Sequence, residues 1–93
     1  MPRPKLKRCL KFNPSVYYFK PRGVPLKLLE EVILEEDELE ALKLHDIDNL
    51  EQKKASKRMR ISQPTFARIL NSVYKKLANA IINGKAIKIK KNG

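Results

Sequence analysis

The chain has 93 residues and a formal net charge of +11, with 42% hydrophobic and 33% charged residues. This length fits one small domain, and the apolar content is too high for a disordered tail. No apolar run approaches the ~18 residues of a membrane-spanning helix, and residues 1–12 (MPRPKLKRCLKF) lack the apolar centre of a signal peptide. We therefore expect a cytoplasmic protein with a polyanionic partner and no membrane association.

The single cysteine and the single histidine limit the chemistry of the chain. Cys9 cannot form an internal disulfide, and Cys9 with His45 cannot make a common Cys/His zinc site, so we expect no metal and no cofactor. A buried hydrophobe is the favoured role for Cys9, with a bridge between two chains or a reactive thiol as alternatives. His45 beside Asp46 has the residue types of a base and its orienting carboxylate, but adjacent helical residues point in different directions. Because no nucleophile is placed near them, we do not expect an enzyme.

The charge is divided into three blocks along the chain. Residues 1–22 carry seven cations and no acid, residues 23–51 carry all ten acids with two lysines, and residues 52–93 carry twelve cations and no acid. A block of twelve like charges repels itself unless a counter-charge neutralises it. The two basic ends are therefore the parts of the chain that we expect to meet a polyanion.

Residues 1–25 have the composition of an arm, and residues 26–93 that of a domain. The arm holds five of the six prolines and four of the six aromatic residues, which rules out a long helix. Within residues 1–12 we expect a basic arm that reaches phosphates or a minor groove through Arg3, Lys5, Lys7 and Arg8. Residues 16–25 are predicted to be extended, with Tyr17, Tyr18 and Phe19 packed on the domain, although stacking on unpaired bases is an alternative.

An acidic helix is predicted over residues 35–46. Asp37 and Glu40 have the spacing of a capping box, and the acids that crowd the start of the helix suit its dipole. Asn49 is suited to the left-handed turn that ends such a helix. A short basic helix follows over residues 52–59, although only Ala55 and Met59 are apolar within it.

A long helix is predicted over residues 63–82. Ser62 is a good N-cap, and Pro64 falls in the first turn, where its missing N–H is harmless. The apolar stripe of this helix consists of Phe66, Ile69, Leu70, Val73, Leu77, Ala80 and Ile81. We interpret the stripe as core, with its far end at Tyr74, Leu77 and Ile81 able to extend into a homodimer interface. Asn83 and Gly84 end the helix, and residues 86–90 alternate as a strand does, with residues 32–34 as the pairing partner.

This order of elements predicts a mainly α fold: a three-helix, winged-helix-like helix-turn-helix with an extended N-terminal arm and a short terminal β-strand pairing. On that frame, one face of the long helix enters the major groove and contacts bases through Gln63, Pro64, Ala67, Arg68 and Asn71. Gln can bond adenine bidentately and Arg can bond guanine. The phosphate contacts are assigned to Lys53, Lys54, Lys57, Arg58, Arg60, Ser62, Thr65 and Lys75.

Two long stretches carry a family resemblance. Residues 37–44 (DELEALKL) and 55–69 (ASKRMRISQPTFARI), with residues 19–26 (FKPRGVPL) and 83–87 (NGKAI), resemble domain-of-unknown-function family 134 over nearly the whole chain. The family consists of small bacterial and archaeal predicted DNA-binding proteins whose helix-turn-helix is similar to region four of sigma factors. The resemblance implies duplex DNA as ligand and transcription control as context. One departure from the motif is Arg60, which stands where a helix-turn-helix usually has glycine because the turn tends to need positive φ. Either the turn is reshaped, or Arg60 accepts strain to reach a phosphate.

The leading hypothesis is sequence-specific binding of double-stranded DNA by a homodimeric transcriptional regulator. Binding of RNA through the basic arm and the aromatic residues is one alternative. The other is a protein-interaction module in which the acidic helix 35–46 docks on RNA polymerase or another transcription protein. That alternative is compatible with DNA binding by the rest of the domain.

Overall fold

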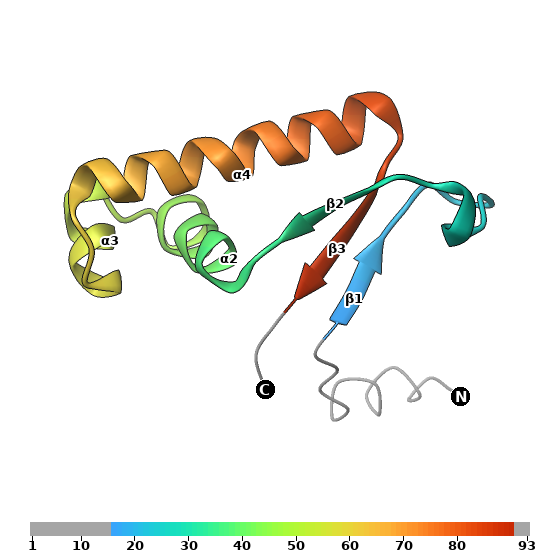
Figure 1. The fold of residues 1–93 in the computed structure, drawn as a ribbon. Coiled ribbons are helices and arrows are strands. Elements are labelled where there is room, and N and C mark those ends of the chain that lie inside the picture. Colours follow the sequence, from blue (N-terminus) through green and yellow to red (C-terminus); the bar gives the residue numbers. More distant parts are fainter. Residues whose placement is uncertain (1–15, 91–93) are drawn as a thin grey trace.

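A computed structural model describes residues 16–90 of the chain (Figure 1). Within them the fold is mainly helical, with three α-helices and a small three-stranded mixed sheet. The elements in chain order are β1 (Val16–Phe19), the 3-10 turn η1 (Leu26–Leu28), β2 (Glu31–Leu34), α2 (Glu36–Leu42), the π-helical turn η2 (Lys43–Ile47), α3 (Gln52–Met59), α4 (Gln63–Asn83) and β3 (Ala86–Lys90). The predicted arm residues Arg3, Lys5, Lys7 and Arg8, together with Cys9, lie outside the described residues.

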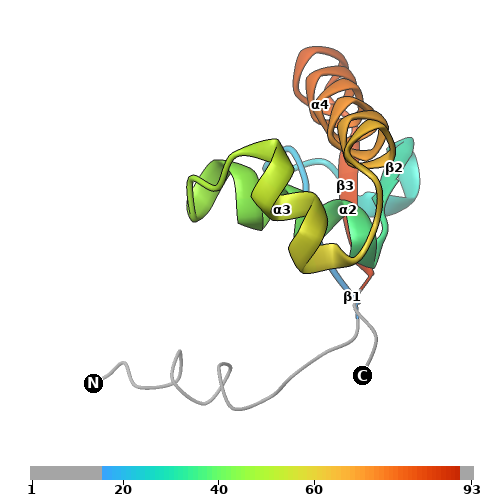
Figure 2. The same cartoon turned by 90° about the vertical axis from the view of Figure 1, so that its left-hand side faces the viewer.

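Helix α4 is the longest element, and the other elements are distributed along it. At 1.5 Å per residue, its 21 residues span roughly 30 Å. Helices α2 and α3 lie at its N-terminal end, and the sheet lies toward its C-terminal end (Figure 1). Figure 2 views the molecule from the end that carries α3. The two ends of α4 therefore support two different surfaces.

The ends of the helices follow the predicted signals. The Ser62 side chain caps α4 by accepting a hydrogen bond from the backbone N–H of Thr65 at 3.2 Å, and Pro64 lies in the first turn. Gly84 ends the same helix with φ 66°, and Asn49 adopts the left-handed conformation after η2 with φ 59°. The predictions for residues 52–59 and 63–82 as helices are thus confirmed, the second ending one residue later.

The predicted capping box of α2 is wrong. The N-cap is Glu35, and its partner at the third position is Glu38, so that Asp37 and Glu40 lie inside the helix. The backbone N–H of Glu35 donates to Glu38 Oε1 at 2.9 Å. Glutamate is a weaker N-cap residue than aspartate, which is why the sequence favoured Asp37. The helix also leaves the α-helical pattern at Lys43, where the π-helical turn η2 begins.

Strand β3 is the centre of the sheet, with β1 antiparallel on one side and β2 parallel on the other. The predicted pairing of residues 32–34 with the terminal strand is confirmed, since Val32 is opposite Ile87 and Leu34 is opposite Ile89. A parallel pair needs a long crossover, and α2, α3 and α4 supply it. The pairing of β1 with β3 was not predicted, because the prolines around residues 14–25 favoured an isolated extended segment.

The core between the helices is small. Five buried residues from α2, η2, α3 and α4 form it, namely Ala41, Leu44, Ala55, Phe66 and Leu70. Leu50, Met59, Ile61 and Ile69 pack around this cluster. Under the remainder of α4, Val73 and Ala80 are buried, as are Leu34 and Ile89 on the sheet. The small side chain of Ala55 allows α3 to approach the other helices closely.

Two expectations about apolar side chains are wrong. Tyr17, Tyr18 and Phe19 are 37%, 37% and 59% exposed, rather than packed into the domain. Their strand is at the edge of the sheet, and Tyr17 and Phe19 meet each other edge-to-face with centroids 5.9 Å apart. Ile81 was assigned to the core stripe but is 71% exposed, because it lies beyond the last residue of α4 that the sheet covers, Ala80.

A buried carboxylate joins α2 to α4 and to β2. Glu38 is 7% exposed and accepts hydrogen bonds from Ser72 Oγ at 2.8 Å and from Lys76 Nζ at 2.8 Å. The same Lys76 amine donates to the backbone carbonyl of Ile33 at 2.7 Å. Burial raises the pKa of Glu38, but the hydrogen bonds from the Glu35 backbone, Lys76 and Ser72 outweigh it and hold the pKa below its ordinary value. The ionised carboxylate is therefore the form that the fold stabilises.

We predict that Glu38→Gln destabilises the protein by about 1–3 kcal/mol, because it leaves the partly buried Lys76 amine without its anion. Thermal unfolding monitored by circular dichroism measures the loss. Since the pKa of Glu38 is lowered on folding, its contribution is complete above the ordinary glutamate pKa and is lost as pH falls through the folded-state value. The difference between wild type and variant should shrink over that acidic range.

The matched control is Glu31→Gln, which removes an exposed carboxylate on β2. We expect a change within about 0.5 kcal/mol. Equal losses for the two variants at neutral pH would contradict the role assigned to Glu38.

Candidate nucleic-acid interface

Helix α3 presents a solvent-exposed set of cations. Lys53, Lys54, Lys57 and Arg58 are all exposed, whereas Ala55 and Ser56 turn inward and are buried. The Ser56 hydroxyl donates to the backbone carbonyl of Lys53 at 2.9 Å, so the small polar residue in the helix crossing is satisfied. Lys54, Lys57 and Arg58 line a shallow hollow together with Leu50. An anion placed there would meet three positive side chains.

The predicted base-contacting residues share one outward face of α4. Gln63, Pro64, Arg68 and Asn71 are exposed and Ala67 is half-buried, while Phe66, Leu70 and Val73 occupy the buried face. At 100° per residue, Pro64, Ala67, Arg68 and Asn71 fall within about 100° of one another, and Lys75 continues the same stripe. The predicted set therefore lies together on the surface, with Gln63 at its margin.

Arg68, Asn71 and Lys75 line a shallow groove along this stripe. Ser72 and Lys76 complete the groove, although the sequence did not single them out. Ser72 is four residues from Arg68 and Lys76 is four residues further on, and this helical spacing is the signal that could have identified them. Lys76 is already neutralised by Glu38, so Arg68 and Lys75 supply the free positive charge of the groove.

The cap of α4 also contributes polar groups to the surface. The Ser62 hydroxyl donates to Thr65 Oγ1 at 2.8 Å, and Arg68 Nη2 lies 3.4 Å from the same oxygen. Ser62 is exposed and Thr65 half-buried. This chain of contacts holds the Arg68 guanidinium toward the N-terminal end of the helix, where the dipole is positive and attracts an anion.

None of the seven cations assigned to this surface is neutralised by an acid of residues 16–90. The ion pairs among those residues are Lys43–Asp48, Lys76–Glu38 and Lys85–Glu30, at 2.8, 2.8 and 3.0 Å. The surface cations are Lys53, Lys54, Lys57, Arg58, Arg60, Arg68 and Lys75. Three of the ten acids of residues 23–51 form these ion pairs, each with a lysine outside this set, so the seven surface cations have no ion-pair partner among residues 16–90.

The turn between α3 and α4 contains a strained residue. Arg60 adopts φ 60° and ψ 43°, the left-handed conformation that glycine adopts freely and that costs other residues about 1–2 kcal/mol. Its backbone N–H donates to Lys57 O at 3.0 Å, and Ile61 N–H donates to Ser56 O at 3.0 Å. The expectation that this position requires positive φ is confirmed, and the Arg60 side chain is exposed.

His45 and Asp46 are engaged in separate structural contacts. His45 Nδ1 donates to the Leu50 carbonyl at 2.8 Å, and its ring packs edge-on against Phe66. The Tyr74 hydroxyl donates one bifurcated hydrogen bond to the Asp46 carboxylate, with its oxygen 2.8 Å from Oδ2 and 3.1 Å from Oδ1. Burial and then the Asp46 carboxylate raise the pKa of Tyr74 to about 12, so the phenol stays protonated and continues to donate at neutral pH. These contacts tie η2 to α4.

The geometry defines a small, mainly helical protein with a cationic surface built on α3 and the first half of α4. The chain belongs to the family described as "Protein of unknown function DUF134", whose model matches residues 1–93. No helix of residues 16–90 has both the length and the apolarity to cross a membrane.

Three relatives show how closely this family agrees with the chain. A UPF0251 protein of Moorella thermoacetica is 54% identical over 89 residues, which are 96% of this chain and 60% of the relative. A UPF0251 protein of Caldanaerobacter subterraneus subsp. tengcongensis is 51% identical over 96% of this chain and 75% of the relative. One of Desulfosudis oleivorans is 49% identical over 96% and 64%. The chain thus spans only about three fifths to three quarters of the length of these relatives, and no solved structure matches it.

We predict that Arg60→Gly raises the free energy of unfolding by about 0.5–1 kcal/mol, because relief of the left-handed strain exceeds the entropy that glycine adds to the unfolded chain. Thermal or urea unfolding measures the change. Arg58→Gly is the matched control: it makes the same chemical change two residues earlier, inside α3, and should lower stability by about 1 kcal/mol. A loss of stability in Arg60→Gly would contradict the assigned strain.

Proposed function

We propose that this chain binds double-stranded DNA through a helix-turn-helix made of α3, the Arg60–Ile61 turn and α4, and that it regulates transcription. The observation that carries the proposal is a set of seven exposed cations on α3, on the Arg60–Ile61 turn and on the outward face of α4, none of which forms an ion pair with an acid of residues 16–90. A polyanion is the counter-charge that such a surface requires. The family description assigns no function, so the proposal rests on this surface.

The shape of the surface favours a duplex. An α-helix fits the width of the major groove of B-DNA, and the predicted base-contacting residues lie on one outward face of α4, away from its buried side. The lysines and arginines of α3 are exposed as well and can contact phosphates, which would set the register of the helix. The stacking of bases, in contrast, would rely on aromatic residues, and Tyr17, Tyr18 and Phe19 lie on β1, in the sheet, rather than on this surface.

In the proposed complex, Arg68 and Asn71 read base edges, and Gln63, Pro64 and Ala67 contact the groove near the N-terminus of α4. Arg can donate bidentately to guanine, and Asn or Gln can bond adenine. Lys53, Lys54, Lys57, Arg58, Arg60, Ser62, Thr65 and Lys75 contact phosphates.

The first test is the salt dependence of duplex binding, measured by fluorescence anisotropy with labelled DNA. If six phosphates are neutralised, log K should fall against log salt with a slope of about −5. Lys57→Ala should reduce the slope by about 1 and weaken binding to all sequences equally. Lys27→Ala removes the same charge from the 3-10 turn η1 and is the matched control, for which the slope should not change. Absence of salt-dependent binding in wild type would overturn the proposal.

The second test separates reading of bases from positioning. A preferred duplex is first selected from a random pool. Arg68→Ala should then cost about 1–3 kcal/mol on that duplex and should flatten the base preference at one position, whereas Lys57→Ala keeps the preference. If Arg68→Ala and Lys57→Ala lower affinity by the same factor on every duplex, Arg68 contacts phosphate instead.

Competition with structured RNA of the same length distinguishes RNA as the ligand. Tighter binding of RNA at physiological salt would replace duplex DNA in the proposal. Docking on RNA polymerase through α2 is not favoured by a separate observation, because much of the acidic segment has an intramolecular role, including Glu38 with Lys76 and Asp46 with Tyr74.

A further inference from the structure

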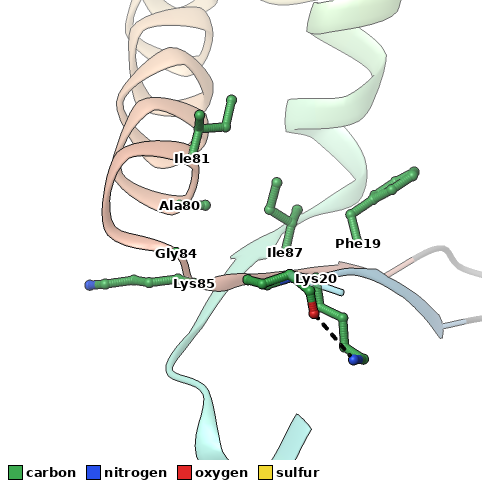
Figure 3. A pocket seen from close by; sticks show the side chains of 8 residues that line it. Phe19, Lys20, Ala80, Ile81, Gly84, Lys85 and Ile87 are labelled. Carbon is green, nitrogen blue, oxygen red and sulfur yellow. Dashed lines mark hydrogen bonds between the residues drawn. The ribbon is translucent and has the colours of Figure 1, made fainter. Parts of the chain in front are cut away.

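An apolar groove lies at the C-terminal end of α4, far from the cationic surface. It is lined by Phe19 at the end of β1 and Pro21 after it, by Ala80 and Ile81 on α4, and by Ile87 on β3. Figure 3 shows the Ile81 side chain on the helix and those of Phe19 and Ile87 on the sheet around the same open space. Since three separate elements contribute apolar side chains, the groove is a property of the fold rather than of one segment.

The exposed side chains of this region form an unusually apolar patch for so charged a chain. Ile81 is 71% exposed and Phe19 59%, and the adjacent Ile82 is 79% exposed. Of these three residues, Phe19 and Ile81 line the groove, and Ile82 follows Ile81 on α4. The core of a homodimer interface is about 65% apolar, and large exposed apolar side chains are typical of it. The patch can therefore form the apolar centre of a dimer interface.

We propose that a second copy of this chain covers the groove, with the two-fold axis beside β1. Among residues 16–90, β1 is at the edge of the sheet, and its sequence VYYF contains none of the charges or prolines that keep natural edge strands from pairing. A two-fold axis next to such a strand places identical patches against each other, which is the arrangement of most homodimers.

The charges at the rim of the groove favour a second copy of this chain over a partner whose surface charges all have the same sign. Lys20 lies on the β1 side, and Lys85 pairs with Glu30 at 3.0 Å, with the Glu30 side chain 80% exposed. A uniformly acidic or basic partner would meet like charge at part of this rim. A second copy brings both signs and can match Lys20 with the exposed Glu30 carboxylate.

The position of the groove also suits the proposed binding of DNA. The spacing argument of this paragraph rests on that proposed function, and the other arguments for the dimer do not. Since α4 is roughly 30 Å long, joining two copies at its C-terminal end holds the two N-terminal ends apart. An included angle of about 70° between the two helices would separate them by ~34 Å, which is one turn of B-DNA. Of the three residues that the sequence assigned to a dimer interface, Ile81 lines the groove, Leu77 is half-buried and Tyr74 bonds Asp46.

Sedimentation equilibrium of the full chain at about 1–100 μM tests the proposal. Wild type should have twice the 10.8 kDa mass of one chain. Ile81→Glu should weaken the dimer at least ~tenfold, because it places a carboxylate in the apolar centre of the interface. Phe19→Asp should do the same from β1, so that a folding defect in one variant, detected by circular dichroism, does not remove the test.

The matched control is Ile47→Glu, which makes the same change at an isoleucine that is equally exposed, at 71%, but lies on η2. It should leave the dimer unchanged. The proposal is overturned by a wild-type monomer at 100 μM, by folded Ile81→Glu and Phe19→Asp variants that dimerise normally, or by equal weakening in Ile47→Glu.

The oligomer and the DNA measurements fail independently. A wild-type monomer that binds duplex would refute only the dimer, and a wild-type dimer that binds no duplex would refute only the proposed function.

Discussion

The buried carboxylate of Glu38 is the contact on which the arrangement of the molecule depends. It is 7% exposed and is satisfied by Ser72 and Lys76 of α4, while Lys76 also donates to the Ile33 carbonyl of β2. A buried charge that loses its partners is costly, so α2, α4 and β2 cannot slide relative to one another without breaking the network. The core between the helices has five buried residues, and so small an apolar core fixes the relative positions of the elements only weakly. The polar network around Glu38 adds the contacts that fix them.

The same contact explains why the charges of the chain are divided. Acids occur only in residues 23–51, and several of them have structural partners: Glu30 with Lys85, Glu38 with Lys76, and Asp46 with Tyr74. The net charge of +11 is therefore not spread evenly over the surface. Seven of the cations lie on α3, on the Arg60–Ile61 turn and on the outward face of α4 without such partners, so part of the excess positive charge is assigned to these exposed side chains.

Features set by local chemistry were mostly predictable, whereas most features set by tertiary contacts were not, the pairing of β2 with β3 being the exception. Ser62, Asn49 and Gly84 mark helix ends because each acts on its own neighbours, and the outward stripe of α4 follows from helical periodicity. The capping box at Glu35 was missed because the position of Glu38 is also set by its hydrogen bond with Lys76, which is 38 residues away in the sequence. A local pattern does not show that contact. The role of β1 was missed because its pairing with β3 is formed across the whole domain, and periodicity could not show that the sheet ends short of Ile81.

Among residues 16–90, three residues after helical segments adopt the left-handed conformation: Asn49 after η2, Arg60 after α3 and Gly84 after α4. Asparagine and glycine tolerate it better than arginine does, so the comparison of interest is between Gly84 and Arg60. At the end of α4, Gly84 takes φ 66°; a Cβ there would meet nothing within 4 Å, so the glycine is explained by backbone conformation alone. At the end of α3, Arg60 takes φ 60°, and because arginine has a Cβ atom this conformation costs it energy that glycine would not pay. The difference between the two positions is what surrounds them: Gly84 borders the apolar groove, whereas Arg60 stands among the cations of α3 and α4. Strain that persists where a glycine would relieve it indicates that the side chain has a task outside the fold. At Arg60, that task is best explained by the same polyanion that the surrounding cations require.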